Sequence, residues 1–323
     1  MATLFGFNAF LKVAEEASWG AGAGGSTKVD IRLNSSTLQT GQERPRKTNL
    51  SVPSSGMLAS TFDGFRNSGG TVDIPIQYNG SGMFFKLALG AVSTSAAAAD
   101  FIHEYTPTFA LPSIEIAFQR GSNLTDSSET FVGCMVSSMS VSCAAGEEMT
   151  ASFDVIAEDS AARAANLTSS FPAGDSVLHF ESGSLTMAGT LLPSSVEIRS
   201  FELTLDNKLE RKNVLGSKLT SQPVISDVRE VTMSITADVD DNNVYISQLA
   251  GTSGLVSIKF TSTAASSHYI EFQLSNAVIE DYSDSVTSFG RVERTFSVRG
   301  LASTASNGLV IEIRNGNSSA ITG

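Results

Sequence analysis

Short runs in which apolar and polar residues alternate are the feature that most constrains the fold of this chain. The run TVDIPIQYN, residues 71–79, places its valine and isoleucines on one side and Asp73 on the other. Successive side chains of a strand point to opposite faces, so such a run predicts a strand with one buried face. Similar runs, separated by Gly, Ser, Asn and Asp, recur along the chain. The pattern therefore predicts an all-β protein.

Two distant stretches follow one plan, in which an alternating run, a polar turn and an apolar segment end at a glycine. They are GTVDIPIQYNGSGMFFKLALG, Gly70–Gly90, and REVTMSITADVDDNNVYISQLAG, Arg229–Gly251. A plan that recurs within one chain indicates an internal repeat. Any two β domains share alternation, however, so chance similarity is the alternative interpretation.

Pairs of matching residues favour the repeat. Val72 falls on Val231, and Phe153 falls on Phe296. The second pair is closer together in the sequence than the first. We assign this to a loop difference, because AVSTSAAAADFIHEYTPTFALP follows the glycine of the first stretch and only TSG follows that of the second. We expect the two halves to superpose with the same strand order, Val72 over Val231 and Phe153 over Phe296.

Composition bounds the class of protein. The chain has 323 residues, of which 41% are hydrophobic, and its net charge is −12. Such an acidic chain is not expected to grip duplex DNA, because that binding depends on Lys and Arg neutralising phosphates. Cys134 and Cys143 have no metal-type spacing and are predicted to be reduced and buried. With no secretory signal and no apolar run of membrane-spanning length, we expect a soluble protein made in the cytoplasm.

Candidate catalytic and metal-binding residues are few. The three histidines, His103, His179 and His268, lie in different segments without a partner at ligand spacing. The stretch DVDDNN, residues 238–243, starts like a calcium loop but lacks its later glycine and glutamate. We therefore expect no catalytic residue, no metal, no cofactor and no enzymatic activity.

Basic residues are concentrated in two long irregular stretches, 41–69 and 206–228, which hold 8 of the 21 lysines and arginines. Irregular stretches of this length within a compact domain are usually functional or disordered. Basic loops on an acidic body suggest contact with another copy of the chain, and a solvated loop is the alternative. The candidate contact residues are Arg44, Arg46, Lys47, Met57, Leu58 and Phe62 in the first stretch and Lys208, Arg211 and Lys212 in the second.

Residues 1–27 are predicted to form an N-terminal arm, in which LFGFNAFLKVAEEA is interpreted as a short helix or a strand. The stretch SWGAGAGGST, residues 18–27, interrupts regular structure and is predicted to be a hinge. Trp19 is interpreted either as a plug in the core or as an anchor that docks the arm.

Several stretches resemble sequences of tail tube proteins (major tail proteins) of tailed bacteriophages. They are LKVAEEASWGAGAG, GTVDIPIQYNGSGMFFKLALG, YTPTFALPSIEIAFQRG, FVGCMVSSMSVSCAAGEEMTASFDVIAED and SFELTLDNKLERKN with the repeat that follows it. The resemblance covers residues 12–300. It implies two tandem β-sandwich or half-barrel tube domains, residues 28–165 and 166–300, that join into a ring-shaped β-barrel. A C-terminal tail, 301–323, follows.

The resemblance also implies a structural protein of the virion tail, assembled in the host cytoplasm. Its rings would stack into a hollow tube through which DNA passes without specific binding. Six tube domains usually close a ring, so a chain with two would form trimeric rings with pseudo-sixfold symmetry. Other tail proteins are expected at the tube ends, and no membrane is expected in the tube body.

The negative net charge leads us to expect a negative or neutral lumen, which would repel phosphates over about a Debye length. Alternation offers two faces and does not choose between them. A β-rich adhesion or surface-layer module is the alternative function, and a glycan-cleaving β-sandwich enzyme is a third. The candidate acidic positions are Asp73, Glu115, Asp154, Glu202, Glu230 and Glu271.

Overall fold

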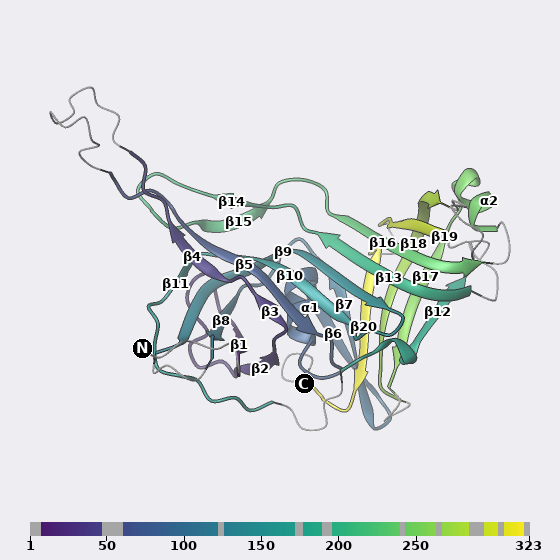
Figure 1. Cartoon of the computed structure of the whole chain (residues 1–323), viewed down its shortest axis with the longest axis horizontal. Coiled ribbons are helices and arrows are strands. Elements are labelled where there is room, and N and C mark those ends of the chain that lie inside the picture. Colours follow the sequence, from purple (N-terminus) through teal and green to yellow (C-terminus); the bar gives the residue numbers. More distant parts are fainter. Residues whose placement is uncertain are drawn as a thin grey trace.

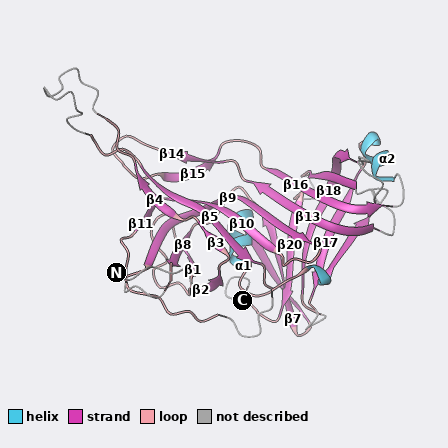
Figure 2. Cartoon of the chain, in the orientation of Figure 1, coloured by secondary structure: helices cyan, strands magenta, loops and turns pink. Residues whose placement is uncertain are grey.

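The computed structural model describes residues 8–46, 61–121, 126–171, 177–188, 196–239, 243–262, 267–283, 294–302 and 307–319. Antiparallel strands form most of this part of the chain, as predicted, and two short α-helices accompany them (Figures 1 and 2).

The elements of the first half are β1 (Phe10–Glu15), β2 (Val29–Arg32), β3 (Ser35–Ser36), β4 (Gln39–Gln42), β5 (Arg66–Pro75), α1 (Gly82–Leu89), β6 (Gly90–Ala97), β7 (Asp100–Pro107), β8 (Ile114–Gln119), β9 (Ser128–Ala144), β10 (Thr150–Ala157) and β11 (Asp159–Ser160). Those of the second half are a 3-10 turn (Phe180–Ser182), β12 (Gly183–Ala188), β13 (Val196–Asp206), β14 (Leu209–Lys212), β15 (Ser221–Ile225), β16 (Glu230–Val239), α2 (Asn243–Ala250), β17 (Ser253–Thr261), β18 (Tyr269–Ser283), β19 (Arg294–Gly300) and β20 (Leu309–Asn315).

One continuous sheet crosses both halves. Its neighbours, in order, are β3 with β4, then β5, β10, β9, β13, β16, β19 and β18. The first parts of β9 and β18 pair with other strands. The first part of β9 pairs with β8 and β11, and the first part of β18 pairs with β17 and β20. The edges of these second groups are extended by β1 and β2 on β8, by β12 on β17, and by β7 and β6 on β20.

Each of the two long strands carries a β-bulge. In β9 the bulge leaves Ser137 without a residue opposite it in β10, and in β18 it leaves Glu280 without one in β19. A bulge bends its strand and increases the local twist. The bends allow β9 and β18 each to take part in two groups of strands.

The apolar faces enclose a single hydrophobic core that includes both halves. The Phe84 ring of α1 stacks on that of Phe153 in β10, with their centroids 4.8 Å apart. Phe272 of β18 contacts Phe85 of α1 and Phe201 of β13, each at a centroid distance of 6.1 Å. Aromatic contacts of this kind join the first half directly to the second.

Helix α1 occupies the apolar segment of the first repeated stretch. Its sequence, GMFFKLAL, is apolar on nearly every side, and every residue except Lys86 is buried. A helix without a polar face is stable only when protein surrounds it. Gly90 ends the helix with a φ of 107° and donates its N–H to the Lys86 carbonyl. A Cβ at this glycine would lie 2.3 Å from the Thr108 hydroxyl, so both conformation and space require glycine.

Two expectations about irregular segments need correction. The segment after Gly90, expected to be a loop, is the hairpin β6–β7, whose second strand buries His103 and Tyr105 and pairs with β20. The stretch 206–228, expected to be irregular, contains the hairpin β14–β15. Strand β1 lies within residues 1–27, and its Leu11 and Val13 are fully buried. The signal for the β6–β7 hairpin was the inward alternation of His103 and Tyr105 within FIHEYT. The alanine-rich start of the hairpin concealed this signal.

The junction between the halves is the pairing of β9 with β13, and Asn207 fastens its end. The Asn207 side-chain amide donates to the carbonyls of Ala88 at 2.9 Å and Val136 at 3.0 Å, and its backbone N–H donates to the Ser137 carbonyl at 2.9 Å. Asn207 itself is fully buried. A single side chain thus connects the end of α1, the bulge of β9 and the end of β13.

Asn207→Ala is expected to lower the free energy of unfolding by about 2–3 kcal/mol, because two buried carbonyls lose their donor. Urea denaturation followed by circular dichroism measures the change. Asn34→Ala, at an exposed position, is the control and should change stability by less than about 0.5 kcal/mol. Equal effects of the two substitutions would contradict this role of Asn207.

Candidate assembly surfaces

The face of the continuous sheet that points away from the core carries polar residues in cross-strand rows. Directly opposed residues share a face, so the registers define the members of each row. The rows are Asp73, Ser152, Ser140, Thr204, Thr232 and Arg299; then Thr150, Ser142, Glu202, Ser234, Ser297 and Asp281; then Thr71, Asp154, Ser138, Asp206 and Glu230. We call this surface the polar face.

Four of the six acidic positions expected at a lumen lie on the polar face. They are Asp73, Asp154, Glu202 and Glu230, and Asp206 and Asp281 join them. Most other members are serine or threonine, so acids outnumber bases in these rows and the face is negative.

The basic side chains beside these acids are paired. Lys208, at the end of β13, lies 2.8 Å from Asp206 and 3.2 Å from Glu230. The side-chain hydrogen bonds from these two carboxylates raise the pKa of Lys208. Arg299, at the end of the first row, lies 2.6 Å from the Glu280 carboxylate. Neither cation therefore offers an uncompensated positive charge on the polar face.

The other two acidic positions lie outside these rows and are paired. Glu115 accepts hydrogen bonds from the Lys28 Nζ at 2.5 Å and the Ala23 N–H at 2.8 Å. Burial acts to raise the Glu115 pKa, but these hydrogen bonds and the Lys28 charge outweigh it, so the pKa lies below its ordinary value. Glu271 accepts a hydrogen bond from the Ser257 hydroxyl at 2.6 Å and lies 3.4 Å from the Lys259 Nζ. Both carboxylates stabilise their own strands.

The two basic stretches lie against each other within the chain. Lys218 forms an ion pair of 2.7 Å with Asp63, and its carbonyl accepts the Arg66 N–H at 2.8 Å. The Lys218 hydrogen bond lowers the pKa of the Asp63 carboxyl. Figure 1 shows the β14–β15 hairpin running beside the ends of β4 and β5. The two stretches therefore form one surface in the subunit.

The candidate contact residues of these stretches have different environments. Arg44, Arg46 and Lys212 are exposed, and the Phe62 side chain is half exposed. Arg211 is partly buried and donates to the carbonyls of Ser68 and Ala157, so it fastens the hairpin to the body. Lys47, Met57 and Leu58 lie outside the described residues.

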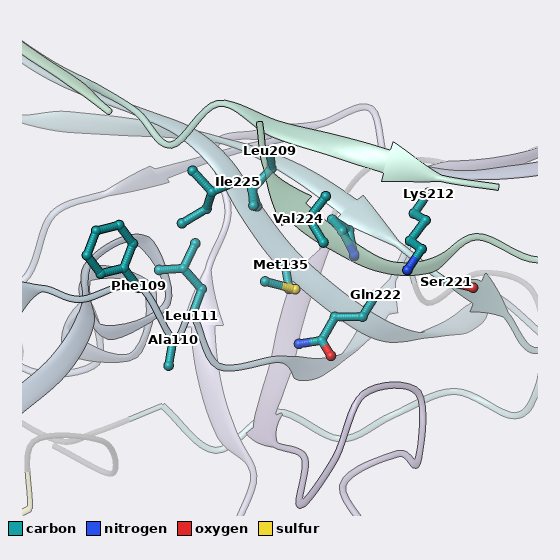
Figure 3. A pocket seen from close by; sticks show the side chains of 11 residues that line it. Phe109, Ala110, Leu111, Met135, Leu209, Lys212, Ser221, Gln222, Val224 and Ile225 are labelled. Carbon is teal, nitrogen blue, oxygen red and sulfur yellow. The ribbon is translucent and has the colours of Figure 1, made fainter. Parts of the chain in front are cut away.

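A groove of about 500 Å³ lies between the β14–β15 hairpin and the segment after β7. Figure 3 shows Phe109 and Leu111 on one side and Leu209, Val224 and Ile225 on the other, with Met135 at the base. Phe109 is 91% exposed and Val224 is half exposed. Apolar side chains left open in this way indicate a contact surface.

The glycine-rich stretch after β1 is fastened to the body at Glu16, in place of the expected hinge. The Glu16 carboxylate accepts the N–H groups of Gly20, Gly22 and Gly133, at 3.1, 3.2 and 2.9 Å. The Trp19 ring lies over Gly133, where a Cβ would come within 3.1 Å of it. This placement favours the interpretation of Trp19 as a plug over that of a docking anchor.

A carboxylate near this stretch provides a pH test. Burial, then the charges of Glu16 and Asp159, raise the pKa of Glu158. A raised pKa favours the protonated acid in the folded state, so ionised Glu158 destabilises the fold at neutral pH and ceases to do so below its ordinary pKa of 4.5. Glu158→Gln is therefore expected to raise the melting temperature at about pH 7 and to leave it unchanged at about pH 3.5. Calorimetry of both proteins checks this, with the exposed Glu202→Gln as control; a gain that is independent of pH would contradict it.

The described residues contain no helix long and apolar enough to cross a membrane. Across the same described ranges, no group of three or more His, Cys, Asp and Glu side chains is arranged to hold a metal ion. Buried His103 bonds to Thr94, Asn315 and the Asn317 carbonyl, which gives it a structural role. Cys134 and Cys143 are free and buried, as predicted.

A family model described as phage tail tube protein matches residues 6–300, which includes nearly every described strand. No curated protein matches the chain.

Proposed function

Because the chain belongs to the phage tail tube protein family, we propose that it carries two tube units in tandem, so that three copies close one ring of the tail tube. The protein is a structural, non-enzymatic component of the phage tail, and tail tube proteins polymerise into tubes. The proposal concerns how this chain does so: trimeric rings of pseudo-sixfold symmetry, stacked around a lumen through which DNA passes. A closed ring requires complementary surfaces on the two sides of every subunit.

Strand pairing supports two units. In the first half β5 pairs with β10, β10 with β9, and β9 with β8. In the second half β16 pairs with β19, β19 with β18, and β18 with β17, in the same antiparallel sense. Helix α1 follows β5 as α2 follows β16. The number of residues from the bulge at Ser137 to the bulge at Glu280 is the same as the number from Phe153 to Phe296.

The registers refine the equivalence of individual residues. Phe153 is opposite Val72, and Phe296 is opposite Ile235. If Phe296 is the counterpart of Phe153, then Ile235, and not Val231, is the counterpart of Val72. Val231 and Ile235 are separated by an even number of positions, and an even shift keeps the same face. Under this equivalence Val72 has Ile235 as its counterpart, and Val231 lies on the same face of β16, four positions before it.

The polar face is the proposed lumen. It is the face of the continuous sheet that points away from the hydrophobic core. This face extends across both units and carries acidic and hydroxyl side chains in rows. A surface without excess Lys and Arg does not hold a phosphate backbone. A passing duplex would therefore slide along it and would not be trapped.

The basic stretches are proposed to contact a neighbouring subunit or ring. Replacing residues 48–60 by a short Gly/Ser linker is expected to leave a folded subunit that no longer makes tubes, because Met57 and Leu58 would no longer supply apolar contact in the assembly. Electron microscopy and circular dichroism measure the two properties. A linker variant that polymerises like the parent would show that the stretch is only a solvated loop.

Electron microscopy of the purified full chain tests the proposed function. We expect hollow tubes whose rings contain six similar lobes made by three chains, with a lumen of negative or neutral charge. Rings of six chains, or a lumen dominated by Lys and Arg, would overturn it. The observation that carries the proposal is the equal pairing of strands, bulges included, in the two halves.

A further inference from the structure

We propose that β4 of a second copy of this chain pairs with the end of β18, antiparallel, and that this pairing closes the ring. The register places Gln39 opposite Ser283, Thr40 opposite Tyr282 and Gly41 opposite Asp281. This inference rests on the two tube units of the proposed function, and it names the two edges and their register.

The junction within the chain provides the pattern. There β13 of the second unit pairs with the end of β9 of the first, with Thr204 opposite Ser140 and Asp206 opposite Ser138. The end of β9 corresponds to the end of β18, because both follow the bulge and pair on their other side with β10 and β19.

The first strand of each unit corresponds as well. β4 pairs with β5 as β13 pairs with β16: Gln39 is opposite Gly69 and Thr204 is opposite Thr232. Gln39 is therefore the counterpart of Thr204. The bulges make Ser283 the counterpart of Ser140, because each is the third residue after its bulge. Since Thr204 is opposite Ser140 inside the chain, Gln39 is placed opposite Ser283 between copies.

Both edges are open in the subunit. Within the described ranges, β4 pairs as a strand only with β5, and the end of β18 pairs as a strand only with β19. The Tyr282 N–H donates to the Asp281 carboxylate at 2.9 Å, a local hydrogen bond that pairing with a second strand would replace. Gln39, Gly41, Asp281 and Ser283 are exposed. A strand edge that has no neighbouring strand pairs readily with another strand.

Helix α2 leaves apolar residues beside the open edge of β18. The Tyr245 and Tyr282 rings are 5.9 Å apart, and the Gln248 amide donates to the Glu280 carbonyl at 3.2 Å. Ile246 is 57% exposed and Leu249 is 70% exposed. The corresponding helix α1 is buried, and its Phe85 contacts Phe272 of the second unit. The helix is thus covered where the next unit is present and open where it is absent, which points to a second copy of this chain as the partner.

The side chain that fastens the internal junction also has a counterpart. Asn207 follows β13 and donates to the carbonyls of Ala88 and Val136. Asn207 follows Thr204 by three residues, as Gln42 follows Gln39, so Gln42 is the counterpart of Asn207. Gln42 also carries a side-chain amide. In the subunit this amide donates to the Gly64 carbonyl at 2.7 Å. Between copies it would reach the end of α2 and the bulge of β18.

Cysteine cross-linking tests the register. The variant Gln39→Cys with Ser283→Cys is oxidised in the assembled full-length protein and separated under non-reducing denaturing conditions. Opposed Cα atoms are about 4.5–5.5 Å apart, which a disulfide spans. We expect dimers and trimers and nothing larger, because a ring of three closes the series. The native thiols stay inert, since both are buried and burial raises the pKa of Cys143 to about 11.

Two matched variants complete the experiment. Thr204→Cys with Ser140→Cys, opposed at the internal junction, should form a disulfide within one chain. Gln39→Cys with Asp281→Cys is out of register on the same face, about 7–8 Å apart, and should cross-link at least tenfold less. Tubes that form without the Gln39–Ser283 cross-link would overturn the proposed edge and leave the proposed function intact. A protein that makes neither rings nor tubes, with the internal disulfide formed, would overturn both.

Discussion

Replacing Phe272 with alanine is expected to lower the free energy of unfolding by about 3–5 kcal/mol, the usual range for a buried phenylalanine. Phe272 is fully buried in β18, and its ring contacts Phe85 in the first half and Phe201 in the second. The cavity would therefore open where the two halves share their core. We expect both halves to lose stability together.

The single tryptophan makes this result measurable. Trp19 lies over Gly133 in the first half, whereas the substitution is in the second. The midpoint of urea unfolding followed by Trp19 fluorescence should shift by the same amount as that followed by circular dichroism. Phe109→Ala removes a phenylalanine that is 91% exposed and should shift neither. A fluorescence midpoint that stays in place while the other moves would mean that the halves unfold independently.

Local pattern predicted the strands because alternation depends only on neighbouring residues. Val72 and Ile74 are fully buried in β5 with Asp73 between them on the other face, as the run implied. The two helices could not be predicted in this way. GMFFKLAL is too short and too uniformly apolar to show helical periodicity, and it becomes a helix because the sheets enclose it.

Long-range pairing decided what the sequence left open. Alternation along each strand predicted that Asp73 and Asp154 lie on the face opposite their apolar neighbours. Only the pairing registers between strands show that both share one face with Glu202 and Glu230. Asn207 was missed because a lone asparagine after a strand is typical of a turn. Its function depends on the carbonyls of Ala88 and Val136, which are distant in sequence.

Ile246→Asp is expected to abolish rings and tubes while leaving the subunit folded. Ile246 is 57% exposed on α2, so a carboxylate there remains solvated in the free subunit and should change stability by less than about 0.5 kcal/mol. In the ring this position would be covered by the next copy, and burying an unpaired carboxylate is strongly unfavourable. Sedimentation and electron microscopy measure assembly, and circular dichroism measures folding.

Two comparisons make the result specific. Ile246→Leu keeps the apolar side chain and should assemble like the parent. Leu215→Asp places the same charge on a fully exposed leucine of the β14–β15 hairpin, away from the edge of β18. This variant should still close rings, because the ring contact is proposed at β4, β18 and α2 and does not include Leu215. Tubes formed by Ile246→Asp would show that α2 stays open in the assembly, and rings lost in Leu215→Asp would place the ring contact at the hairpin.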